Sequence, residues 1–167
     1  ALVAGNASVE RHLDGTAIDA GGLVPDVVDT NTWVQTIEQI SPVELLETQL
    51  CNYTAPFILI SKLRPAMADA ARKATSGRAD IVNVSAMEGV FGRGYKGAGH
   101  PNTNAAKAAM NMVTRTSAQE MFQSDGILMT SVDTGWITDE RPHFDKLRLA
   151  EEGFHAPLDL VDGAARV

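Results

Sequence analysis

The sequence predicts an α/β fold in which helices flank a parallel sheet. Two short runs of apolar and β-branched residues, 81–85 and 127–132, have strand character, and a long segment with helical features precedes each of them. Strands separated by helices join as right-handed βαβ units whose strands run parallel. Ligands bind such sheets beyond the carboxyl ends of the strands. We therefore expect a site near residues 85–86 and 133–135.

The composition is that of a globular protein with room for a sizeable core. Of the 167 residues, 44% are apolar and 21% are charged, which argues against disorder. The net charge of −7 disfavours nucleic acid or a membrane as partner, because both need a basic surface. The lone cysteine, Cys51, cannot form an internal disulfide, and its apolar surroundings predict a buried, inert thiol. We expect a cytoplasmic protein.

The chain divides into a loop-rich front and an α/β domain. Residues 1–40 contain many turn formers and little periodicity, so we expect an insertion or linker there and the domain over residues 41–167. The domain begins with a capping box at Ser41 and Glu44. Within the helix that follows, Pro56 predicts a kink that leaves the carbonyl of Asn52 free, and Pro65 predicts an end or a second bend.

The rest of the domain alternates between strands and helices. The strand over 81–85 leads into a glycine-rich loop over 87–101, and a helix rich in small residues follows over about 102–122. The second strand, 127–132, ends in a turn at residues 133–138, and a short helix is expected over 142–152.

Four blocks of this chain, in this order, resemble the short-chain dehydrogenase/reductase family over roughly residues 40 to 140. They match the helix with the active-site Asn, the strand that delivers the active-site Ser, the helix with Tyr-x-x-x-Lys and the loop under the nicotinamide. The blocks are Asn52-Tyr53-Thr54-Ala55-Pro56-Phe57, Ile81-Val82-Asn83-Val84-Ser85-Ala86-Met87-Glu88-Gly89, Thr103-Asn104-Ala105-Ala106-Lys107-Ala108-Ala109 and Val132-Asp133-Thr134-Gly135-Trp136-Ile137-Thr138.

The resemblance implies a Rossmann-like sheet, NAD or NADP as cofactor, and hydride transfer between nicotinamide and a carbonyl or alcohol substrate. It assigns cofactor binding to Lys107 and to the backbone of Gly135, Trp136, Ile137 and Thr138. The family's Thr-Gly-x-x-x-Gly-x-Gly fingerprint has no counterpart here; Leu2 to Ala7 is a degenerate likeness to either the strand before that fingerprint or the family's later Asn-Asn-Ala-Gly strand. We therefore expect a fragment that lacks the glycine-rich N-terminal half of the fold.

The proton-transferring tyrosine is replaced by Thr103, whose hydroxyl is shorter and far less acidic than a phenol. Thr103 is equally compatible with a helix N-cap. His100, one turn earlier, is a second candidate, because histidine is the side chain most often used as a general acid or base, although an isolated loop histidine is more often a plain surface residue. Tyr95 is a third candidate, without fixed geometry toward Lys107. A block running from His100 to Lys107 resembles an atypical subgroup with an insertion before its first helix.

The other candidate catalytic residues are Lys107, Asn52 and Ser85. Lys107 matches the family's lysine, although a lone lysine is usually solvated. Asn52 matches in residue type and coincides with the Pro56 kink. The family's serine position falls on Ala86, and Ser85 faces the opposite side of the strand unless the strand end bends.

Three hypotheses remain open at this stage. The first is an NAD(P)-dependent oxidoreductase, the second a catalytically degenerate relative that serves binding or assembly, and the third a lyase or epimerase with another acid. The histidines show no paired ligand spacing, so no metal is expected. Two strands with helices leave apolar faces uncovered, so we expect a homo-oligomer through the two long helices.

Overall fold

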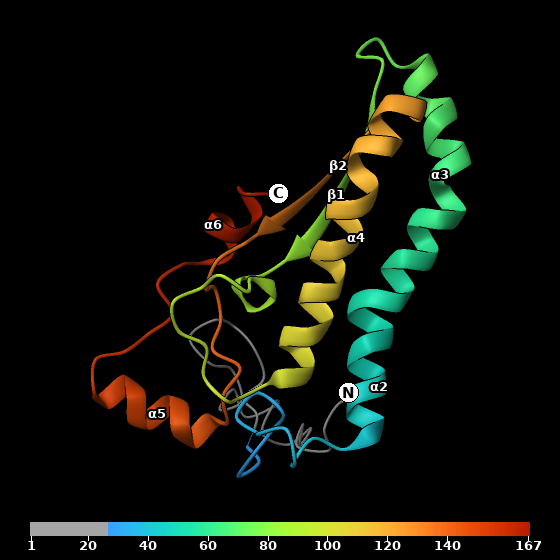
Figure 1. The fold of residues 1–167 in the computed structure, drawn as a ribbon. Coiled ribbons are helices and arrows are strands. Elements are labelled where there is room, and N and C mark those ends of the chain that lie inside the picture. The colour runs from blue at the N-terminus through green and yellow to red at the C-terminus, as the bar shows by residue number, and fades with distance from the viewer. Residues whose placement is uncertain (1–26) are drawn as a thin grey trace, which may run out of the picture.

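The computed structural model describes residues 27–167 and confirms the predicted α/β fold with flanking helices (Figure 1). The degenerate likeness at residues 2–7, to either of two strands of the family, lies outside the described part. In chain order the elements are α2 (Pro42–Gln49), the π-helix η1 (Leu50–Thr54), α3 (Ala55–Lys73), β1 (Ala79–Ser85), the 3-10 helix η2 (Met87–Gly89), α4 (Pro101–Asp125), β2 (Ile127–Asp133), α5 (His143–Glu151) and α6 (Leu160–Ala164).

The two strands pair in parallel, as predicted. Their register runs from Ala79 opposite Ile127 to Ser85 opposite Asp133, and α4 makes the crossover between them. Each observed strand includes the segment expected from the sequence and extends it by one or two residues. Because both strands end together, the segments that leave Ser85 and Asp133 begin side by side.

The first helix begins where the sequence predicted, but the capping box is only half formed. The Ser41 hydroxyl accepts a hydrogen bond from the Glu44 amide at 3.1 Å. The Glu44 carboxylate accepts instead from the Thr32 hydroxyl, at 3.3 Å. The cap therefore also connects the helix to the segment that precedes it.

Where the sequence predicted a kink near Asn52, the structure has the π-helix η1 between α2 and α3. Pro56 is the second residue of α3, where its missing N–H falls within the change of helical pattern. The alternative of a helix end at Pro65 is wrong, since α3 continues through it to Lys73. Cys51, in η1, is exposed, so the expectation of a buried thiol is also wrong.

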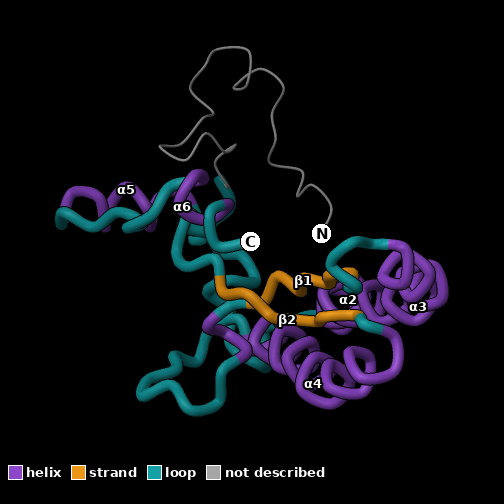
Figure 2. The backbone as a smooth tube through the Cα atoms, turned by 90° about the horizontal axis from the view of Figure 1, so that it is seen from above, coloured by secondary structure: helices purple, strands orange, loops and turns teal. Residues whose placement is uncertain are grey.

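The core lies between the sheet and the two long helices, which pack on the same side of the strands (Figure 2). Its centre is made of Ala68 from α3, Met121 from α4, and Ile127 and Met129 from β2. On the opposite face of β1, Val82 and Val84 are exposed. In the described part of the chain this second face has no helix packed over these two valines.

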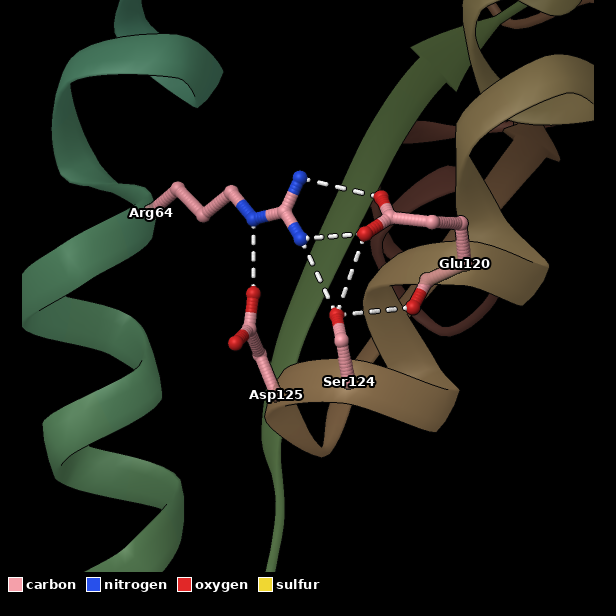
Figure 3. Close-up of polar contacts among 4 residues, drawn as sticks. All are labelled: Arg64, Glu120, Ser124 and Asp125. Atoms are coloured by element: carbon pink, nitrogen blue, oxygen red, sulfur yellow. Dashed lines mark hydrogen bonds and ion pairs between the residues drawn. The ribbon is translucent and has the colours of Figure 1, made fainter.

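An ionic cluster joins the middle of α3 to the C-terminal end of α4 (Figure 3). The Arg64 guanidinium donates to the Asp125 carboxylate at 2.6 Å and makes two bonds to the Glu120 carboxylate at 2.6 and 2.9 Å. It also donates to the Ser124 hydroxyl at 3.0 Å. One side chain therefore fixes the spacing of the two helices over the core.

Among residues 27–167, none of the helices combines the length and the apolar character that crossing a bilayer requires.

Candidate functional site

A cavity of about 640 Å³ opens beyond the carboxyl ends of the two strands. Its lining comes from the turn that contains Trp33, from η2 and the loop after it, from the first turns of α4, and from residues 133–141 after β2. This volume is within the range of small-molecule and cofactor sites, and the position is where parallel sheets bind ligands.

Lys107 lines this cavity from the second turn of α4 and is half-buried. Its ammonium group donates a hydrogen bond to the Val84 carbonyl at 2.9 Å. Burial lowers the pKa of Lys107 from its ordinary value, and the nearby charge of Glu88 opposes that shift. A held, partly desolvated cation at a cavity can interact with a bound anion or polar group more strongly than a solvated surface lysine can.

Thr103 also lines the cavity, and its alternative role as a helix N-cap is wrong. The cap is His100, and the helix begins at Pro101, so Thr103 is the third helical residue. Thr103 and Lys107, four residues apart, lie on the same face of α4 toward the cavity.

His100 lines the cavity at the start of the same helix, and the structure holds it firmly. Its ring stacks on Trp33, with centroids 4.1 Å apart and planes 11° from parallel. Its Nδ1 atom is 2.8 Å from the Trp33 carbonyl oxygen. Tyr95, from the glycine-rich loop, lines the cavity as well but is 83% exposed.

The turn after β2 supplies the opposite wall, with Gly135, Trp136, Ile137 and Thr138 all in the lining. The Gly135 backbone is left-handed, with φ of 79°, and its amide donates to the Asp133 carboxylate at 2.9 Å. Among the described residues, the amides of the three residues that follow have no hydrogen-bond partner. These free donors and the Lys107 ammonium fit the polar end of a nicotinamide dinucleotide.

Ser85 and Asn52 are not among the residues that line the cavity. The buried Ser85 hydroxyl donates to the Asn111 side-chain oxygen at 2.6 Å, and Ala86 occupies the cavity wall beside it. The Asn52 amide donates back along its own helix to the Thr48 carbonyl at 3.2 Å. We expected Asn52, Lys107 and the Gly135 turn to lie together. Lys107 and the turn share the cavity, and Asn52 lies outside it.

Comparison with known proteins agrees with this arrangement. The family model described as short chain dehydrogenase matches residues 7–144. The chain belongs to the short-chain dehydrogenase family. This confirms the resemblance inferred from the four sequence blocks.

Solved structures share the fold of this family member at low sequence identity. The carbonyl reductase Sniffer of Drosophila melanogaster is 22% identical with a TM-score of 0.61, over 93% of this chain and 60% of that chain. The NADPH-bound carbonyl reductase from chicken fatty liver is 24% identical with a TM-score of 0.52, over 83% of this chain and 53% of that chain.

Among curated proteins, the uncharacterized protein R665 of Acanthamoeba polyphaga mimivirus is 29% identical over 152 residues. The match covers 87% of this chain and 31% of the viral protein. The chain thus spans less than two thirds of the length of the relatives it matches.

Two residues that the sequence did not single out help to build the site. Trp33 lies in the segment interpreted as an insertion, yet it is part of the cavity wall and contacts His100. A large aromatic residue among turn formers was the only available signal. Asn111, four residues beyond Lys107 on α4, links Ser85 to the Gly89 carbonyl, to which its amide donates at 3.2 Å.

Among the described residues, no group of three or more His, Cys, Asp and Glu side chains is arranged to hold a metal ion.

Proposed function

We propose that this chain carries the nicotinamide end of the active site of an NAD(P)-dependent oxidoreductase, which transfers hydride between the cofactor and a carbonyl or alcohol substrate. The observation that supports it best is the shared cavity of Lys107 and the Gly135–Thr138 turn beyond the strand ends. The fold shared with the NADPH-bound chicken reductase supports NAD or NADP as the cofactor.

In this proposal the cofactor supplies the hydride chemistry. The chain binds and orients the cofactor and the substrate, and it moves the proton. Lys107 holds the ribose and stabilises negative charge near the reacting oxygen. The amides of Trp136, Ile137 and Thr138, which have no hydrogen-bond partner among residues 27–167, hold the carboxamide or phosphate groups. Thr103 and His100 are the candidates for the proton-transferring group. Ser85 lies outside the cavity and supports its wall through the bond to Asn111 on α4, and Asn52 bonds only within its own helical stretch.

Fluorescence titration of the full-length protein with NADH and NADPH tests this function. We expect saturable binding of one or both, and a loss of affinity of about tenfold, or about 1.4 kcal/mol, in Lys107→Met. Lys62→Met, which removes an exposed lysine from the middle of α3, is the matched control and should bind as the wild type does. Equal affinity in Lys107→Met and Lys62→Met would contradict the proposed site.

A second candidate function is a degenerate family member that binds a ligand or assembles without catalysis. The departures at the cavity favour it: Thr103 replaces the phenol, and Ala86 stands where the family has serine. A member of this kind binds the dinucleotide but transfers no hydride. Transfer of deuterium from 4-deuterated NADH or NADPH to a panel of small aldehydes and ketones separates the two, since only an enzyme yields labelled alcohol.

We also propose that the protein is cytoplasmic and forms a homo-oligomer through its two long helices. Large apolar side chains on these helices are exposed, and such surface is usually covered in a stable protein. They include Leu46, Leu50, Phe57, Ile58 and Leu63 on the first helical stretch and Met112 and Phe122 on α4.

Light scattering of the chain tests the oligomer. We expect a mass that is a multiple of 17.8 kDa, which Leu50→Glu lowers. Leu160→Glu, at an exposed leucine of α6, is the control that should leave it unchanged. A wild type of one 17.8 kDa unit would contradict the proposal.

A further inference from the structure

His100 has a backbone conformation that a non-glycine residue rarely adopts. Its φ and ψ of 45° and 48° are left-handed, and in the described part of the chain it alone among non-glycine residues has a positive φ. The residue before a proline is normally extended, and Pro101 follows directly. Such outliers persist only where surrounding contacts hold them, and they concentrate at functional sites.

Four contacts hold His100 in place, and three of them come from the turn around Trp33. The ring stacks on the Trp33 indole, Nδ1 bonds to the Trp33 carbonyl, and the His100 amide donates to the Gln35 carbonyl at 3.0 Å. The His100 carbonyl accepts from the Asn104 amide at 3.1 Å, in the first turn of α4. The imidazole is thus fixed in position, plane and rotation.

The turn that holds the histidine is itself anchored. The Asn31 side-chain oxygen accepts from the Trp33 amide at 3.1 Å, and the Asn31 amide group donates to the Glu140 carbonyl at 2.8 Å. Glu140 and Trp33 both line the cavity, so Asn31 joins two of its walls. The indole is therefore a fixed surface for the ring of His100.

Gly99 permits the close approach of the two segments. A Cβ atom at this position would be 2.9 Å from the Trp33 carbonyl oxygen, closer than side chains are found to main-chain atoms. The same oxygen accepts the bond from His100. Any side chain at Gly99 must therefore move the group that orients the imidazole.

The bond from Nδ1 determines the chemistry of the other ring nitrogen. A carbonyl oxygen only accepts, so Nδ1 carries the proton. In the neutral ring Nε2 then has a lone pair, and in the described residues Nε2 has no hydrogen-bond partner. An imidazole that is oriented through one nitrogen and open at the other is the arrangement that a general acid–base catalyst requires.

We propose that His100, positioned by Trp33, takes the place of the missing phenol as the proton-transferring group of this cavity. In alcohol oxidation, the substrate O–H bond breaks and its proton passes to Nε2. The carbon-bound hydrogen leaves as hydride to the oxidised nicotinamide, and the carbonyl bond forms. In carbonyl reduction, the same atoms move in reverse, and imidazolium supplies the proton. This inference rests on the proposed oxidoreductase function.

The first test reads the imidazole itself and requires neither cofactor nor substrate. In ¹⁵N-labelled full-length protein, we expect neutral His100 as the Nδ1–H tautomer, although a free imidazole favours Nε2–H. Gly99→Ala should shift His100 toward Nε2–H by displacing the Trp33 carbonyl. Gly94→Ala, in the same loop with nothing within 4 Å of its Cβ, should leave the tautomer unchanged. An Nε2–H tautomer in the wild type would overturn the proposal.

The second test measures hydride transfer with NADH or NADPH and a panel of small aldehydes and ketones. His100→Asn keeps a residue that tolerates left-handed backbone. We expect it to retain dinucleotide binding while kcat falls by roughly 10²–10⁴-fold at unchanged KM. Trp33→Leu should lower kcat by up to roughly 10²-fold, and Trp33→Phe, which keeps an aromatic ring to stack on, should restore most of it.

The outcomes separate this inference from the proposed function. A wild type that binds neither dinucleotide removes the oxidoreductase proposal, and the acid–base role falls with it. A wild type that binds a dinucleotide but transfers no hydride supports the degenerate alternative, and the oxidoreductase proposal and the acid–base role then fall together. The acid–base role alone is overturned if the wild type transfers hydride and His100→Asn retains the wild-type kcat, or if Thr103→Val abolishes hydride transfer while His100→Asn does not.

Discussion

The ammonium group of Lys107 donates a hydrogen bond to the main-chain carbonyl of Val84 across 2.9 Å. This bond connects the second turn of α4 to the last residues of β1. It explains why a lysine in a half-buried position stays directed at the strand end rather than into solvent. The contact therefore links α4 to β1, and in the proposed function it also holds the lysine where the cofactor binds.

Lys107 should make the stability of the protein depend on alkaline pH. Its pKa in the folded state is lowered from 10.5, chiefly by burial, so between the two values the unfolded chain binds more protons than the folded one. The free energy of unfolding therefore rises as the pH is raised through the lowered pKa toward 10.5. Lys107→Met lacks this contribution.

Urea unfolding monitored by tryptophan fluorescence measures the contribution of Lys107 to the pH dependence of the free energy of unfolding. The wild type should gain stability relative to Lys107→Met as the pH rises from neutral toward 10.5. A difference that stays constant over this range would contradict a lowered pKa.

Gly89 should be intolerant of any side chain, because α4 passes directly over it. A Cβ at Gly89 would lie 2.7 Å from the Lys107 carbonyl group and equally near the Asn111 amide nitrogen. Gly89→Ala must move α4 or η2, and overpacking of this kind costs about 1–3 kcal/mol. Gly92→Ala, with nothing within 4 Å of its Cβ, should change stability by less than about 0.5 kcal/mol. Denaturant unfolding of both variants compares these costs, and equal stability would refute the close packing.

The sequence predicted the layers of this fold well because its signals are local. The β-branched run of β1, the helix start at Ser41 and the disturbance before Pro56 each depend on neighbouring residues, and each was found. Of the two alternatives for Pro65, the helix end was wrong because the effect of a proline depends on context: α3 continues through it, packed on the core through Ala68 and Met67.

The site was less predictable, because its contacts join distant segments. No local pattern indicates that Trp33 stacks on His100, 67 residues away, or that Ser85 is bonded to Asn111. Alternation along a strand did indicate that Ser85 and Ala86 face opposite sides, and the structure agrees: Ala86 lines the cavity and Ser85 does not. Ser85 had been a candidate catalytic residue only because its residue type matches the family's serine.

Ser85→Ala should lower stability without affecting dinucleotide binding. The substitution removes the 2.6 Å bond and leaves the Asn111 side-chain oxygen without its donor, which costs about 1–3 kcal/mol. Ser61→Ala, at an exposed serine of α3, is the control and should change stability by less than about 0.5 kcal/mol. Thermal unfolding together with the NADH and NADPH titrations tests the prediction. Loss of binding at full stability would instead give Ser85 a direct role at the cavity.

The Arg64 cluster should hold α3 against α4 in a way that depends on both salt and acid. Hydrogen bonds from Arg64 lower the pKa of the Glu120 carboxyl below its ordinary 4.5. The stabilisation is therefore complete above pH 4.5 and is lost as the pH falls through the lowered value. High salt should weaken the cluster as well, because its side chains lie largely at the surface.

Arg64→Met should accordingly lower the melting temperature at neutral pH and low salt, with a smaller effect in high salt or strong acid. Arg64→Lys should recover only part of the loss, because a single ammonium group cannot reproduce the fork that reaches Asp125 and both oxygens of Glu120. Calorimetric scans of both variants at two salt concentrations and across acid pH make the comparison, with Lys62→Met as the control for loss of a cation from α3. Full recovery in Arg64→Lys would show that charge alone, and not the planar geometry of the guanidinium, holds the two helices together.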